Sequence, residues 1–144
     1  MDKRYNGNFI AANQGVDMLW ILTKEFKFEA AHRLPQHNGL CRRLHGHSFR
    51  GCVKVIGNKL HENGPKVGML VDYIDIKTVL DPIVDRYLDH HDLNETLPIE
   101  NPTSESIAHW LFYLLKQTAP WGDKLVSVTI YETCTSSCEF VGES

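Results

Sequence analysis

A cysteine and two histidines lie close together in the segment CRRLHGHSF, residues 41–49. His45 and His47 are separated only by Gly46, and Cys41 stands four residues before His45. In an extended chain, residues i and i+2 point to the same side, so both imidazoles are expected to face one way. Imidazole and thiolate are the ligands that zinc prefers. The segment favours a structural or catalytic metal site over ordinary packing.

A third imidazole, His32, ends a segment of alternating polarity, and pairing of that segment with residues 47–57 would bring His32 beside the other two. Three histidines leave a fourth zinc position for water or substrate, whereas a closed structural site takes a fourth protein ligand. Cys41 is the candidate for that fourth ligand. An open site with three histidines and a closed site that includes the thiol are both compatible with these residues.

The segment LDHHDLN places Asp89 and His90 next to each other in an irregular stretch. An aspartate can hold an imidazole in one tautomer and raise its basicity. A cysteine near such a histidine can be held as the thiolate. Cys41, Asp89 and His90 are therefore candidates for a base system near the metal, and a solvated charged loop is the alternative.

Glu132 stands at the expected end of a strand, in the segment YETCTSSCEF. A carboxylate in that place can receive a planar, guanidine-like edge through two parallel N–H···O bonds, although an ordinary strand-end acid is the alternative. Cys134 and Cys138 have no further metal ligands nearby in the sequence, which favours packing or turn roles. Cys52 lies within an expected strand and is predicted to be a small core residue.

The elements that must position these groups follow from hydrophobic periodicity. Alternation predicts strands over residues 20–32 and 47–57, and two further strands over 124–133 and 138–143. Helical spacing predicts one helix from Asp72, with a kink or break at Pro82, and a second from about residue 101 to 119. The order β-β-α-α-β-β predicts an α+β layer, a four-stranded antiparallel sheet with both helices on one face.

Length and composition fit this architecture. The chain has 144 residues, 42% hydrophobic and 23% charged, which suits one domain over residues 18–144 after a flexible extension, 1–17. The net charge of -3 gives no support to a nucleic-acid partner. No apolar run is long enough to span a membrane, and the first residues lack a secretory signal, so a cytoplasmic location with free thiols is expected.

Taken together, these segments resemble the 6-pyruvoyltetrahydropterin synthase superfamily. The matching stretches, in the family's order, are FKFEAAHRLP, CRRLHGHSF, MLVDYIDIK, LDHHDLN, ENPTSE and ETCTSSC. The spacing of the cysteine before H-G-H is similar to the bacterial 6-carboxytetrahydropterin synthase branch, which acts early in making the queuosine precursor. Pyruvoyl-forming enzymes usually carry a longer gap there.

The resemblance implies the tunnelling fold and a role for each candidate residue. Zn²⁺ would be held by His32, His45 and His47. Cys41 would abstract a proton, and Asp89 with His90 would complete the relay. Glu132 would anchor the aminopyrimidinone edge of the pterin, with Thr103 and Ser104 also touching it. The implied assembly is a homohexamer of two trimers, with active sites between subunits.

The implied substrate is 7,8-dihydroneopterin triphosphate, and the implied products are 6-carboxy-5,6,7,8-tetrahydropterin, acetaldehyde and triphosphate. Zinc would act as a Lewis acid and the Cys41 thiolate would move a proton, so Cys41 should not ligate zinc in the working state. The alternatives are a pyruvoyl-forming synthase, an aldolase-like cleavage, and a zinc-stabilised module without turnover.

Overall fold

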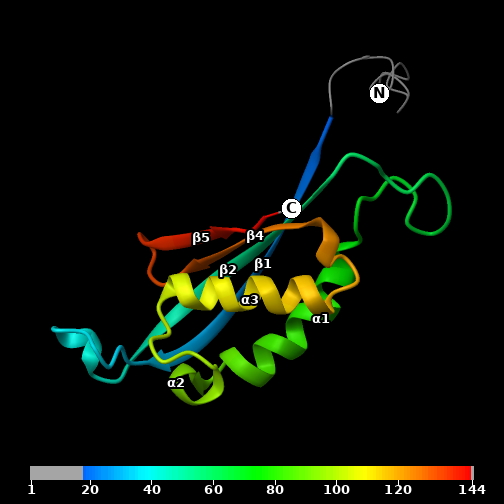
Figure 1. The fold of residues 1–144 in the computed structure, drawn as a ribbon. Helices are drawn as coiled ribbons and strands as arrows, with labels where there is room; N and C mark the ends of the chain where they lie inside the picture. Colours follow the sequence, from blue (N-terminus) through cyan, green and yellow to red (C-terminus); the bar gives the residue numbers. More distant parts are fainter. Residues whose placement is uncertain (1–17, 144) are drawn as a thin grey trace.

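The computed structural model describes residues 18–143, so the extension expected over residues 1–17 lies outside the described residues. Two long strands, β1 (Trp20–His32) and β2 (His45–Gly57), dominate the fold (Figure 1). They pair antiparallel along their whole length, from Trp20 opposite Gly57 to His32 opposite His45. A hairpin loop, residues 33–44, joins them and contains the short 3-10 helix η1 (Leu40–Arg42).

The sheet continues on both sides of this pair. Its strand order is β3-β1-β2-β4-β5, with β4 (Leu125–Tyr131) and β5 (Ser137–Val141) added antiparallel on the β2 side. β3 (His91–Asp92) pairs parallel to β1. The predicted α+β class is confirmed, but the four-stranded antiparallel sheet is wrong, because the backbone N–H of His90 donates to the carbonyl of Glu29 and draws this short segment onto the edge of β1.

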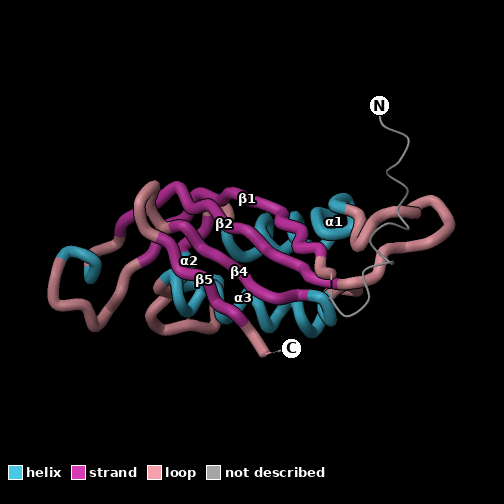
Figure 2. The backbone as a smooth tube through the Cα atoms, turned by 90° about the horizontal axis from the view of Figure 1, so that it is seen from above, coloured by secondary structure: helices cyan, strands magenta, loops and turns pink. Residues whose placement is uncertain are grey.

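Helices cover one face of the sheet, as Figure 2 shows. They are α1 (Tyr73–Ile83), the π-helical turn η2 (Val84–Leu88), α2 (Leu93–Thr96) and α3 (Ser104–Thr118), with the 3-10 turn η3 (Gly122–Lys124) before β4. Asp72 and Thr103 cap α1 and α3 through their side chains, as favoured at helix starts. α2 was not predicted, because the segment around it was expected to be irregular.

Pro82 lies inside α1, one residue before the helix passes into η2. Proline has no backbone N–H and disturbs the hydrogen bonds of the preceding turn. The helix nevertheless continues through Pro82 to Ile83 and then passes into the π-helical turn η2, so the alternative of a break at Pro82 is wrong.

The core lies between the sheet and the helices. Alternate residues of β1 and β2 point into it, and the stacked rings of Phe28 and Phe49 have centroids 4.7 Å apart. From α3, Ile107, Leu111 and Leu115 are fully buried, as their spacing predicts. The same alternation places His32, His45 and His47, at the strand ends, on the helix side of the sheet. In residues 18–143, no helix is long and apolar enough to cross a membrane.

Candidate metal and active site

Three imidazoles meet at the end of the β1–β2 hairpin. His32 lies directly opposite His45 in the register, and His47 follows on the same side of β2. The ring centroids are 4.6 to 5.1 Å apart, and one ligand nitrogen from each residue lies within 4.8 Å of the other two. The strand pairing thus brings together three histidines that could hold a metal ion.

Backbone carbonyls fix the tautomers of two of these rings. Nδ1 of His32 lies 2.8 Å from the carbonyl oxygen of Pro102, and Nδ1 of His45 lies 2.7 Å from that of Arg43. Because a carbonyl only accepts, each Nδ1 must carry the hydrogen and donate it. Each Nε2 is then left with its lone pair, which is the arrangement a metal-ligating histidine uses.

The remaining ring nitrogens provide a test of fit for a cation. Among residues 18–143, Nε2 of His32 and Nε2 of His47 are the buried side-chain nitrogen or oxygen atoms that have no hydrogen-bond partner. A buried polar atom without a partner is costly. Two such atoms that converge with a third imidazole fit a bound metal ion well.

The charge state of His47 suits the same purpose. Burial of the ring lowers the pKa of His47, and the neighbouring His32 and His45 lower it further, while the carboxylate of Glu132 acts in the opposite direction. The neutral imidazole is therefore favoured, and the neutral form is the one that binds a metal.

Glu132 lies beside the histidines, just after β4. Its Oε2 accepts a hydrogen bond of 3.0 Å from the hydroxyl of Ser104, the first residue of α3. Its Oε1 is 3.3 Å from Nε2 of His47, without hydrogen-bond alignment. Thr103 caps α3 by accepting from the backbone N–H of Ser106 at 3.1 Å. The three residues expected to bind substrate therefore gather where the end of β4 meets the start of α3.

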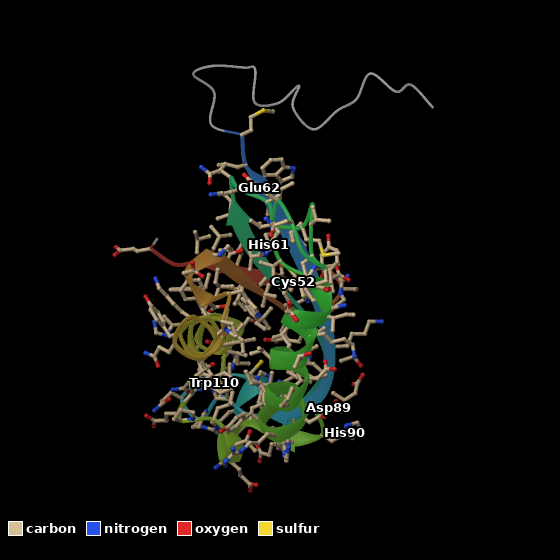
Figure 3. The ribbon with its side chains drawn as sticks, turned by 90° about the vertical axis from the view of Figure 1, so that its right-hand side faces the viewer. Cys52, His61, Glu62, Asp89, His90 and Trp110 are labelled. Carbon is tan, nitrogen blue, oxygen red and sulfur yellow. The ribbon has the colours of Figure 1, made fainter. Side chains whose placement is uncertain are left out.

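Asp89 and His90 form a hydrogen-bonded pair on the outer edge of β1. Oδ2 of Asp89 is 2.8 Å from Nδ1 of His90, and Oδ1 accepts from the backbone N–H of Glu29 at 2.8 Å. These two contacts, the backbone N–H first, lower the pKa of Asp89. The pair lies on the side of the molecule away from Trp110 of α3 (Figure 3).

The backbone and exposure of His90 single it out. It is the one residue other than glycine with a positive φ among residues 18–143, at 60°, and its side chain is 78% exposed. A positive φ is uncommon for a non-glycine residue, and residues in such sparsely populated conformations are often found at functional sites. An open depression of about 550 Å³ lies next to it, bordered also by His47 and by the outward-facing side chains of Glu29 and Ser48.

Cys41 lies in η1 of the hairpin loop and is half-buried. Its carbonyl accepts from the backbone N–H of Leu34 at 2.8 Å, which turns the loop back on itself. Its sulfur is not part of the group formed by the three imidazoles, so the described chain does not form the closed four-ligand arrangement. All four cysteines are free and Cys52 is buried, both as predicted.

Sequence reasoning missed the groups that hold the candidate residues in place. These are the carbonyls of Arg43 and Pro102, and the side chain of Asn94, which bonds the backbone just after His32. Carbonyls give no signal in a sequence, because every residue has one. Asn94 lies in the quoted LDHHDLN segment, but its partner is 61 residues away.

A twisted sheet with helices on one face and three histidines at a hairpin end is typical of the pterin synthases of the tunnelling fold. The chain belongs to this class: residues 21–143 match the model of the 6-pyruvoyl tetrahydropterin synthase family. The predicted membership, and with it the prediction of an enzyme, is confirmed.

Individual relatives refine this assignment. The 6-carboxy-5,6,7,8-tetrahydropterin synthase of Synechocystis is 51% identical over 122 residues, which cover 85% of this chain and 93% of that protein. The dihydroneopterin monophosphate aldolase of Pyrococcus furiosus is 33% identical over 105 residues, which cover 73% of this chain and 82% of that protein. In structure, the 6-pyruvoyl tetrahydropterin synthase of Caenorhabditis elegans has a TM-score of 0.76 at 26% identity, over 88% of this chain and 97% of that one.

Proposed function

We propose that this chain is a zinc-dependent 6-carboxy-5,6,7,8-tetrahydropterin synthase. It converts 7,8-dihydroneopterin triphosphate to 6-carboxytetrahydropterin, acetaldehyde and triphosphate, in a route to queuosine or a related 7-deazapurine. The observation that carries the proposal is the convergence of three imidazoles beside Glu132, with two buried Nε2 atoms lacking partners among residues 18–143. The 51% identity to the Synechocystis enzyme of this name supports the choice of reaction.

The metal would be held by His32, His45 and His47 through their Nε2 atoms. Three neutral nitrogen ligands suit zinc and leave one position open. When bound, zinc supplies Lewis-acid chemistry, which lowers the pKa of hydroxyl groups on a substrate. The carbonyls of Pro102 and Arg43 keep two of the rings in the required tautomer.

Glu132 would bind the pterin. A carboxylate can accept two parallel N–H bonds from the aminopyrimidinone edge. Ser104 holds Oε2 of Glu132 from one side, so the orientation of the carboxylate is fixed before substrate arrives. Thr103 and Ser104 at the start of α3 would line the same end of the pterin.

Cys41, Asp89 and His90 would move protons. The Cys41 sulfur, as thiolate, accepts a proton from the substrate side chain. Oδ2 of Asp89 accepts from Nδ1–H of His90, and Nε2 of His90 is thereby left as the base. The lowered pKa of Asp89 keeps this carboxylate ionised and ready to accept.

The active sites would lie between subunits of a homohexamer built from two trimers. In the described chain, β3 pairs with β1 only at Ala30 and Ala31, and β5 is the strand at the other edge of the sheet. Unpaired strand edges favour pairing with another chain. The exposed His90 can then face a neighbouring copy.

A second candidate function is a neighbouring reaction on the same fold. The Pyrococcus relative carries the name of an aldolase that acts on dihydroneopterin monophosphate, and the Caenorhabditis structure that of a pyruvoyl-forming synthase. Acetaldehyde together with 6-carboxytetrahydropterin separates the proposed reaction from both. A zinc-stabilised module without turnover is the remaining alternative.

The test compares the zinc-loaded protein with Cys41→Ala and with Cys134→Ala, a matched control at an exposed cysteine. Each is given dihydroneopterin triphosphate, and products and zinc content are measured in parallel. The proposal predicts both products from the parent and the control. Cys41→Ala should lose roughly 100-fold or more in turnover, the range for a proton-transfer group, while keeping its zinc.

Other outcomes would overturn parts of the proposal. A pyruvoyl product from the parent would assign the chain to the neighbouring reaction. Absence of turnover in every sample, together with loss of zinc in Cys41→Ala, would indicate a structural metal site that includes the thiol.

A further inference from the structure

The side-chain amide of Asn94, in α2, makes two hydrogen bonds to a single residue of another segment. Oδ1 of Asn94 accepts from the backbone N–H of Arg33 at 2.8 Å, and Nδ2 donates to the carbonyl of Arg33 at 2.9 Å. Arg33 directly follows the ligand His32. One side chain therefore satisfies both backbone groups of the residue next to a candidate metal ligand.

The hydrogen bonds between Asn94 and Arg33 lie just beyond the last residue of β1 that pairs with β3. β3 pairs with β1 only at Ala30 and Ala31, so beyond that point no strand of the described residues covers this edge. Asn94 is the second residue after β3, and its amide bonds the backbone of Arg33, the second residue after Ala31. An amide carries one donor and one acceptor side, as a peptide group does, and this is why it can replace one here.

The same amide also reaches the segment that fixes the tautomer of His32. Nδ2 of Asn94 lies 3.5 Å from the carbonyl of Glu100, two residues before Pro102, whose carbonyl accepts from His32. A second connection joins the hairpin loop to this segment, because Gln36 bonds both Glu100, at 2.9 Å, and Asn101. The backbone of His32 and the carbonyl that orients its ring are thus held relative to each other.

We propose that Asn94 is a positioning residue for the metal site: its amide sets the end of β1 against the segment 97–103 and so directs Nε2 of His32 at the ion. The inference rests on the proposed function in that His32 is taken to be a ligand. It also concerns the loop that carries Cys41, because Arg33 is the first residue of that loop.

Two substitutions separate the parts of the interaction. Asn94→Ala leaves the N–H and the carbonyl of Arg33 without this partner. Asn94→Asp keeps nearly the same shape and can still accept from the N–H of Arg33, but it places a second acceptor against the carbonyls of Arg33 and Glu100. The carboxylate variant therefore tests the donor side of the amide alone.

A matched control lies on the same short helix. The hydroxyl of Thr96 donates to the carbonyl of Tyr87 at 2.6 Å and lies 3.4 Å from the carbonyl of Asp92. Thr96→Val removes both contacts of the hydroxyl, whereas the partners of the Asn94 amide, Arg33 and Glu100, are unchanged. It reports what a loss of stability in α2 does by itself.

The experiment measures zinc affinity by competition with a chromophoric chelator, at a temperature where each protein is folded, with Tm recorded alongside in excess chelator. We expect both Asn94 variants to bind zinc about tenfold more weakly, the effect typical of groups that orient metal ligands. Thr96→Val should lower Tm and keep the zinc affinity of the parent.

The outcomes distinguish this inference from the function on which it rests. If the parent binds zinc and the zinc affinity of Asn94→Asp is within twofold of that of the parent, Asn94 has a structural role only and the inference is wrong. If the parent binds no zinc, the inference and the proposed function fail together. Should Asn94→Ala not fold, Asn94→Asp decides the question by the same threshold.

Discussion

His32 and Pro102 are separated by 70 residues in the chain, yet Nδ1 of His32 lies 2.8 Å from the carbonyl oxygen of Pro102. His32 comes from the first strand and Pro102 precedes the last long helix. The hairpin alone brings the three imidazoles together, but the tautomer of His32 depends on a segment from the second half of the chain. The candidate metal site thus couples the two halves of the fold.

Loss of one imidazole should abolish tight zinc binding. His45→Ala leaves two of the three proposed protein ligands. The loss of zinc affinity should exceed roughly 100-fold, which is the upper end of the loss seen when a residue that hydrogen-bonds a metal ligand is removed. Zinc content after dialysis against a weak chelator measures this. His109→Ala is the control, because His109 packs against Tyr113 and Phe140, outside the group of three histidines. Full zinc in His45→Ala would exclude that residue as a ligand.

Removing the hydroxyl of Ser104 should weaken substrate binding more than zinc binding. Ser104→Ala leaves Oε2 of Glu132 without its 3.0 Å donor, and a hydrogen bond to a charged group contributes about 1.5 to 3 kcal/mol. We expect KM for the pterin to rise at least tenfold and zinc content to stay constant. Thr118→Ala serves as control on the same helix, because the hydroxyl of Thr118 donates to the carbonyl of Leu114 at the far end of α3. An unchanged KM would show that Ser104 does not orient the carboxylate.

Asp89→Asn should impair proton transfer without unfolding the edge of β1. The amide oxygen can still accept from Glu29, but the NH₂ group then faces Nδ1 of His90 and favours the tautomer with hydrogen on Nε2. Turnover should fall about 100-fold or more with KM nearly constant. The exposed Asp85→Asn is the matched control. Equal kinetics for the two variants would remove Asp89 from the relay.

The lowered pKa of Asp89 also predicts a pH dependence of stability. Because the folded-state pKa lies below the ordinary aspartate value of 3.8, the unfolded chain binds a proton at this group more readily than the folded chain does. The contribution of Asp89 is therefore present above that value and is lost as pH falls through the folded-state pKa. Urea unfolding from pH 6 downward should show the difference between parent and Asp89→Asn shrinking in acid. A difference that stays constant to the lowest pH would contradict the shift.

Phe49 should support both the core and the site. Its ring is 2% exposed, stacks on Phe28, and has its centroid 5.4 Å from that of His47 and 5.7 Å from that of His32. Phe49→Ala should cost about 3 to 5 kcal/mol of unfolding free energy, as for buried aromatic truncations. Denaturant unfolding in excess chelator measures this without the contribution of metal. Phe49→Leu should lose less unfolding free energy than Phe49→Ala. Equal losses for the two variants would mean that neighbouring side chains move in to fill the space left by the alanine.

Periodicity predicted the elements that are long and locally determined. Alternation from Trp20 onward predicted β1, and the spacing of Ile107, Leu111 and Leu115 predicted the buried stripe of α3. Asp72 and Thr103 were correctly placed at helix starts. Each of these signals lies within a few residues of the element it describes, which is why the sequence alone carries it.

The missed elements depend on contacts between distant segments. β3 has two residues and α2 has four, too few for any period to show. The path of the chain there is set by the backbone of Glu29, which bonds both Asp89 and the N–H of His90. The contact between Ser104 and Glu132 is of the same kind, since both residues were proposed to bind substrate but nothing local predicted that they would bond each other.

The thirteen consecutive pairs between β1 and β2 fix the face of the sheet to which the three histidines point. Adding or removing a single residue within β2, between His47 and Gly57, would turn both histidines of that strand to the opposite face. A change of length confined to the hairpin loop, residues 33–44, can leave these thirteen pairs as they are. The position of the Cys41 thiol relative to the three histidines can therefore vary with the length of the loop, while the strand register keeps the histidines in place.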